Sequence, residues 1–314
     1  MMDFLTRSLA RRKGDKEPSL RLFTAETTEL VQKAAQLQGT SPLATLALAR
    51  ALTGGILLGG LAKSERNINL QLASDGPLGT VFVDADPQGT VRGYVSKNPD
   101  LAPIVVGKRP SVRHGFGSQG FVNVMRADES GRYFRGTVQL KGGEIDDDLT
   151  DYLLLSEQVQ SVLVLEALQD EHGRITNCVG LLLQALPGAA HTDPIDLKAE
   201  RERLADGVLY EALKSGHDWI DRVLATLGVV ERTELEDKSV SWFCQCSDTR
   251  VRAALAASGI DELSDMIAKE GHAEIFCDFC RTRYYFDKAD LLSLRDLCVS
   301  AALAHKDPSD TGDN

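Results

Sequence analysis

Four cysteines in the C-terminal quarter of the chain constrain its fold more than any other feature. They form a Cys-x-Cys pair, Cys244 and Cys246, and a Cys-x-x-Cys pair, Cys277 and Cys280, with 30 residues between the pairs. Each pair can present both sulfur atoms from one tight turn, as a closed tetrahedral Zn²⁺ site requires. Because oxidation also converts such thiols into disulfides, the spacing leaves two interpretations open, a permanent zinc staple and a redox switch.

A metal ion matters most for the short segment that carries these thiols. The whole chain has 314 residues, enough for two or three domains with cores of their own. The segment from 238 onward is much shorter, although seven of the chain's 18 aromatic residues lie between Trp242 and Phe286. Thiolate-bound zinc contributes on the order of 10 kcal/mol or more to the folding of small modules. His272 could replace one thiol, but four cysteines already complete the ligand shell.

Charge and cysteine usage narrow the class of protein. Lys and Arg total 35 and Asp and Glu total 46, for a net charge of −11, which disfavours nucleic acid as the main partner. Paired cysteines with two isolated ones suit a reducing compartment and a metal. The stretch 1–22 lacks the apolar run of a signal peptide and is predicted to be a flexible, solvated lead-in. A mitochondrial presequence is the alternative, disfavoured by Asp3, Asp15 and Glu17.

Hydrophobic patterning predicts an α+β fold with a second, small module. Strands and helices alternate irregularly over 23–190, which indicates a mixed sheet-and-helix core domain rather than a βαβ repeat. Prolines and glycines near 190 mark a boundary, and 191–237 reads as a charged helical linker. With little apolar surface of its own, this linker must dock on a neighbour and is a candidate for conditional unfolding. The zinc module covers 238–303, and 304–314 is predicted to be a disordered tail.

Three other patterns are interpreted as structural. The apolar segment 42–62 is long enough to span a membrane, but Arg50 and four glycines favour a buried core helix. Gly115–Gly120 matches G-x-G-x-x-G, yet a predicted strand follows it where a dinucleotide site needs a helix. The acidic run 146–148 at a helix start complements the helix dipole rather than binding metal.

These residues resemble a known family. The C-terminal module carries Phe-Cys-Gln-Cys-Ser at 243–247, Cys-Asp-Phe-Cys at 277–280 and Tyr-Phe-Asp at 285–287. This pattern resembles the redox-switch domain of the 33 kDa chaperonin family, the redox-regulated heat-shock holdases. The resemblance covers about residues 20–295, and further matching segments lie at 40–45, 75–79, 91–95, 143–145 and 156–158.

The resemblance implies a function and its regulation. The reduced form would bind zinc through Cys244, Cys246, Cys277 and Cys280 and be folded and largely inactive. Peroxide or hypochlorite, together with unfolding conditions, would pair Cys244 with Cys246 and Cys277 with Cys280 and release the zinc. The linker would then lose its docking partner and expose apolar surface to unfolding client proteins.

The same resemblance implies a cytoplasmic chaperone that acts without ATP, forms a homodimer when oxidised, and passes clients to ATP-dependent refolding chaperones. No enzymatic activity, membrane contact or nucleic-acid contact is expected. The sequence agrees in lacking a Gly-x4-Gly-Lys-Ser/Thr phosphate loop. Cys178 is expected in the core, whereas Cys298 has no role in the family pattern and could disturb the disulfide chemistry.

Two other functions compete with the holdase. A thiol-disulfide oxidoreductase would use Cys277 and Cys280 catalytically, but such a pair normally lies at a helix N-terminus in a βαβ context. Here the pattern predicts the tip of a hairpin. A constitutive zinc module that serves only as an interaction domain is the other alternative.

Overall fold

The computed structural model describes residues 2–61, 67–127, 130–186, 196–205, 207–216 and 219–304. The chain divides into two units, Met1–Phe243 and Cys244–Asn314. The division falls at the first thiol pair, not at 238 as the sequence predicted. The expected boundary at 190 and the tail after Ala304 lie outside the described residues.

The first unit contains a five-stranded antiparallel sheet. In spatial order its strands are β10 (Ser161–Gln169), β11 (Ile175–Ala185), β2 (Leu20–Glu26), β1 (Phe4–Arg12) and β12 (Val229–Ser239). The sheet therefore joins segments from the beginning, the middle and the end of this unit, and β12 lies at its edge.

The prediction of a flexible lead-in at 1–22 is wrong. β1 lies inside the sheet, between β2 and β12. Its buried positions are Leu5, Thr6, Ser8 and Ala10. Because three of these four side chains are small or polar, the strand lacks the clear apolar alternation that marks a half-buried strand in a sequence.

A six-stranded sheet forms the other layer of the first unit. Its strands, in spatial order, are β13 (Ser241–Trp242), β5 (Thr90–Val95), β4 (Thr80–Ala85), β3 (Ile68–Ser74), β8 (Gly120–Ala127) and β9 (Tyr133–Gln139). Only the short β13 runs parallel to its neighbour. The mixture of sheets and helices confirms the predicted α+β class.

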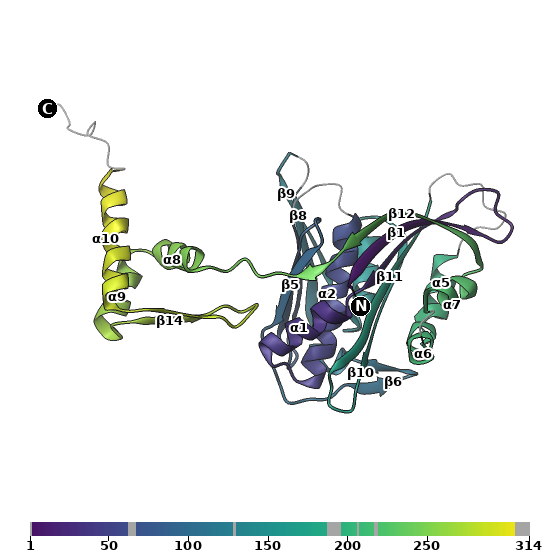
Figure 1. Ribbon diagram of the computed structural model, residues 1–314, viewed down its shortest axis with the longest axis horizontal. Helices are drawn as coiled ribbons and strands as arrows, with labels where there is room; N and C mark the ends of the chain where they lie inside the picture. The colour runs from purple at the N-terminus through teal and green to yellow at the C-terminus, as the bar shows by residue number, and fades with distance from the viewer. Residues whose placement is uncertain are drawn as a thin grey trace. The chain divides into compact units, whose positions relative to one another are not determined.

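Helix α2 (Pro42–Leu61) packs against strands of both sheets and forms the centre of the unit (Figure 1). Two of its glycines permit this close packing. A Cβ atom on Gly55 would lie 2.6 Å from Cγ1 of Val83, and one on Gly54 would lie 2.7 Å from Cδ1 of Leu149. By length and hydropathy α2 could cross a membrane, but 94% of its apolar window is buried within the protein. The interpretation of 42–62 as a core helix is therefore confirmed.

A buried ion network fixes α2 to its surroundings. Arg50 is fully buried and contacts Glu144 at 3.2 Å and Glu166 at 2.8 Å. Arg109 binds Asp146 through two hydrogen bonds of 2.7 and 3.0 Å and approaches Glu166 at 3.6 Å. Burial raises the pKa of Glu166, opposed by the two guanidinium groups. No sequence motif indicated this network, because its members come from distant segments.

The remaining elements of the first unit surround this centre. They are α1 (Thr28–Gln38), β6 (Ile104–Val106), β7 (Arg109–Ser111), α3 (Arg113–Phe116) and α4 (Ile145–Leu155). The glycine motif at 115–120 leads into strand β8, as predicted. The acidic run 146–148 lies in the first turn of α4, and Asp148 also accepts hydrogen bonds from the backbone N–H groups of Lys141 and Gly143.

The predicted linker is helical only in part. Its helices are α5 (Leu197–Ala205), α6 (Val208–Lys214) and α7 (Trp219–Thr226), and its last residues belong to strand β12. The helices bury Leu204, Leu209 and Val223 in one cluster with side chains of β2, β10 and β11. This segment therefore docks on the five-stranded sheet of the first unit.

The second unit is built around a short hairpin. Its elements are α8 (Asp248–Ala257), α9 (Ile260–Lys269), β14 (Ala273–Phe276), β15 (Arg283–Phe286) and α10 (Lys288–Ala304). Among the residues whose side chains are described, six buried ones form its core, with Leu263, Phe286 and Leu291 completely buried. A core of this size contributes little stability by itself.

Candidate metal centre

The four predicted thiols come from two local structures. Cys244 and Cys246 lie in the irregular segment before α8, and Ser247 then caps that helix by accepting a hydrogen bond from the Arg250 backbone N–H. Cys277 and Cys280 lie in the turn between β14 and β15. The turn is closed by the Cys277 N–H, which donates to the Thr282 carbonyl at 3.0 Å. The second pair therefore occupies a hairpin tip, as predicted.

The structure brings all four sulfur atoms together. Each Sγ atom lies within 4.8 Å of the other three. Cys244 and Cys277 are separated by 3.7 Å and Cys246 and Cys280 by 3.3 Å. Zinc–sulfur bonds of about 2.3 Å at tetrahedral angles would place the sulfurs about 3.8 Å apart. The donor set and its spacing therefore fit a tetrahedral thiolate site, while the cluster leaves the disulfide pairing open.

Three of the thiols have shifted pKa values. Burial raises the pKa of Cys244 to about 12 and also raises that of Cys277. Burial acts in the same direction on Cys280, but hydrogen bonds from the hydroxyl and backbone of Thr282 outweigh it and lower the pKa to about 7. Among these three thiols Cys280 ionises most easily, and a bound cation would deprotonate its neighbours as well.

Two residues that lie beside the sulfurs were not predicted from the sequence as part of the site. The Thr282 hydroxyl lies 3.1 Å from Sγ of Cys280. Tyr284 contacts Cys246, and this hydrogen bond raises the pKa of the tyrosine. Both follow the Cys-x-x-Cys pair within four residues, so the predicted hairpin could have drawn attention to them. All four cysteines are half-buried, which leaves them open to small oxidants.

The remaining candidate ligand and the other two cysteines lie elsewhere. His272 stacks on Tyr285 and is not part of the thiol cluster. Cys178 is completely buried beside Thr53, and burial raises its pKa to about 11, which confirms it as a core residue. Cys298 is half-buried against the core of the second unit, with Sγ 3.7 Å from the Ala256 carbonyl oxygen.

Two of the arginines near the thiols pair with acidic residues. Arg252 pairs with Asp248 at 2.6 Å and with Asp290 at 3.0 Å. Arg283 pairs with Glu274. These contacts neutralise the positive charge that a zinc ribbon would present to a phosphate backbone.

The fold and the site define a two-unit α+β protein with a cysteine cluster suited to a metal. A family model described as Hsp33 protein matches residues 9–287. A 33 kDa chaperonin from Synechocystis is 38% identical over 301 residues, covering 94% of this chain and 96% of that protein. A 33 kDa chaperonin from Desulforamulus reducens is 33% identical over 291 residues, with 93% and 96% covered.

A solved structure agrees with these relatives. The crystal structure of the 33 kDa chaperonin (heat shock protein 33 homologue) from Thermotoga maritima superposes with a TM-score of 0.72 at 25% identity, covering 95% of this chain and 99% of that one. The chain therefore belongs to the Hsp33 family, the 33 kDa chaperonins, as the resemblance implied.

Proposed function

We propose that this chaperone is an oxidation-activated holdase that acts without ATP. The observation that carries the proposal is the cluster of four half-buried thiols, all within 4.8 Å of one another, in a unit with a small apolar core. Cys244, Cys246, Cys277 and Cys280 would hold Zn²⁺, which when bound cross-links the two halves of the unit and keeps the sulfurs as thiolates.

Oxidation removes the ligands of this site. Each pair of thiolates gives up two electrons on forming a disulfide, and one molecule of hydrogen peroxide accepts these electrons, together with two protons from the solvent, to give two waters. Disulfide sulfurs no longer bind zinc as thiolates do. Following the family pattern, the disulfides would join Cys244 to Cys246 and Cys277 to Cys280. With the cross-link lost, a core of six buried side chains is left to hold the second unit together.

The surface for client proteins would come from α5, α6 and α7. These helices bury an apolar cluster on the five-stranded sheet, and the strand that follows them, β12, pairs only at the sheet edge and is largely exposed. Undocking them exposes apolar side chains on both the helices and the sheet. The docking partner in this mechanism is the sheet, which revises the expectation that the thiol module itself holds the linker.

The proposal also covers the clients, the oligomeric state, the downstream chaperones and the cellular location. Clients are unfolding proteins, the oxidised form is a homodimer, and ATP-dependent chaperones refold what it holds. A cytoplasmic location follows from the reduced thiols that the site requires. The relatives are named chaperonins rather than enzymes, which favours a holdase over a thiol-disulfide oxidoreductase.

Zinc release and client protection, measured together, test the proposal. A chromogenic chelator reports zinc while light scattering follows the aggregation of an unfolding client, before and after peroxide. We expect one zinc per chain to be released as protection appears, and mass spectrometry to find the two within-pair disulfides. Zinc retention in the oxidised protein, or zinc loss without protection, would favour a constitutive zinc module. Multiple turnovers with a dithiol substrate would favour the oxidoreductase.

A further inference from the structure

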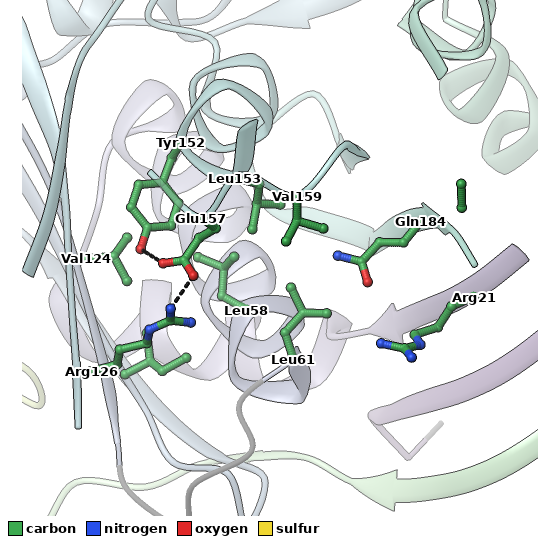
Figure 2. A pocket seen from close by; sticks show the side chains of 12 residues that line it. Arg21, Leu58, Leu61, Val124, Arg126, Tyr152, Leu153, Glu157, Val159 and Gln184 are labelled. Atoms are coloured by element: carbon green, nitrogen blue, oxygen red, sulfur yellow. Dashed lines mark hydrogen bonds and ion pairs between the residues drawn. The ribbon is translucent and has the colours of Figure 1, made fainter. Parts of the chain in front are cut away.

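A cavity of about 320 Å³ lies in the first unit, far in sequence from the thiols (Figure 2). It is lined by the C-terminal end of α2, by α4, and by strands of both sheets. Its apolar wall is formed by Leu58, Leu61, Val124, Leu153 and Val159. Such a wall, with a few polar groups on its rim, is the composition of a small-molecule site.

On one side of the rim the polar and charged side chains pair with one another. The Tyr152 hydroxyl donates a hydrogen bond of 2.6 Å to Glu157, and Arg126 pairs with the other oxygen of the same carboxylate. Figure 2 shows these three side chains joined in a chain on one side of the cavity. The negative charge of Glu157 is thus balanced by Arg126.

The other side of the rim carries an excess positive charge. Arg21, from β2, lines the cavity and has no ion-pair partner among the described residues. The neighbouring Gln184 uses its amide N–H to bind Ser161. A guanidinium group without a carboxylate partner at the rim of an apolar cavity favours an anionic ligand. The lining as a whole has two guanidinium groups and one carboxylate.

We propose that this cavity binds the anion of a medium-chain carboxylic acid. The carboxylate accepts hydrogen bonds from Arg21, and the alkyl chain lies against Leu58, Leu61 and Val159. Since a water molecule occupies about 30 Å³, the cavity accommodates about ten non-hydrogen atoms, the size of octanoate. An inorganic anion would leave the apolar wall uncovered, and a neutral alcohol would leave the guanidinium without a charged partner.

Calorimetric titration of octanoate into the reduced, zinc-loaded full chain tests the proposal. We expect saturable binding of one octanoate per chain, with 1-octanol and acetate each at least about tenfold weaker, because each lacks one of the two interactions. Bound octanoate should also raise the melting temperature of the chain with increasing concentration.

Variants locate the site. Arg21→Gln should weaken octanoate binding at least about tenfold while leaving 1-octanol unchanged. Arg135→Gln, which removes an exposed arginine outside the cavity, is the matched control and should bind like the wild type. Val159→Phe fills the cavity from its partly exposed rim and should abolish binding even if the Arg21 variant fails to fold. Wild-type affinity in Arg21→Gln or Val159→Phe, or acetate binding as tightly as octanoate, would overturn the proposal.

Discussion

Trp219 is the side chain whose removal best tests the role of helices α5 to α7. It is 4% exposed on α7 and belongs to the apolar cluster that docks these helices on the five-stranded sheet. Its indole N–H also donates a hydrogen bond of 2.9 Å to Glu26 of β2. Trp219→Ala should therefore undock the helices without touching the thiol cluster.

The size of the effect follows from these contacts. Truncating a buried tryptophan to alanine costs about 3–5 kcal/mol. Because Trp219 also loses a hydrogen bond to a carboxylate, we expect a cost in the upper part of that range. At about 4 kcal/mol, and with each 1.4 kcal/mol worth a factor of ten, the undocked population rises nearly a thousandfold. Trp219→Phe keeps most of the buried ring and loses only the hydrogen bond. It should cost about 1–2 kcal/mol, or roughly a tenfold rise.

Hydrogen exchange and client aggregation, measured on the reduced and zinc-loaded protein, provide the assay. In Trp219→Ala the amides of α5 to α7 should exchange faster than those of α2, and the protein should suppress aggregation without peroxide. Trp219→Phe should be intermediate, and Leu155→Ala, at a position 57% exposed, should behave like the wild type. If the helices lose protection in Trp219→Ala and suppression still requires peroxide, undocking of these helices is not the activating step.

Three further predictions concern other parts of the chain. Cys277→Ser removes one thiolate, so the zinc content measured by a chelator should fall and some client protection should appear without oxidant; a silent variant with wild-type zinc affinity contradicts this. Arg50→Met leaves Glu144 without its cation and Glu166 with only the more distant Arg109, so chemical denaturation should show a loss of about 3–5 kcal/mol. Cys178, with a pKa of about 11, is about one part in a thousand thiolate at pH 8. Its alkylation in the folded protein should accelerate as the pH rises toward that value, and rapid labelling at pH 8 without unfolding would refute the assigned burial.

The thiol cluster could be predicted because the cysteines of each pair are close together in the sequence. A Cys-x-Cys and a Cys-x-x-Cys pair each fix two sulfurs in one turn, so only one long-range placement remained to be made. The hairpin that carries Cys277 and Cys280 was visible for the same reason, since its two short strands flank the turn directly.

Strands β1 and β12 of the five-stranded sheet could not be predicted in this way. β12 contains Glu231, Arg232 and Glu234 and is exposed along most of its length, so its pattern resembles a charged linker. β1 buries Thr6 and Ser8 where a strand usually shows large apolar side chains. β1 and β12 are recognised as strands mainly because they pair with each other. Local periodicity cannot predict pairing between two segments so far apart in the sequence.

The buried ion network escaped prediction because single residues from separate elements form it. Arg50 was noted only as an argument against a membrane span, and its partners Glu144 and Glu166 were not connected with it. The position of Arg21 beside the cavity is likewise visible only in three dimensions. Such sites follow from the tertiary arrangement rather than from any motif.

The pairing of β1 with β12 also has a consequence for biosynthesis. Thr6 of β1 and Asp237 of β12 are hydrogen-bonded through their side chains although they are 231 residues apart. During synthesis β1 is made before β12, so the edge of β1 that pairs with β12 stays unpaired until most of the chain has been made. Since domains tend to fold during synthesis and long-range strand pairing is slow, the nascent protein spends this interval with an open sheet edge. A chaperone thus passes through a stage in which it needs protection from aggregation itself.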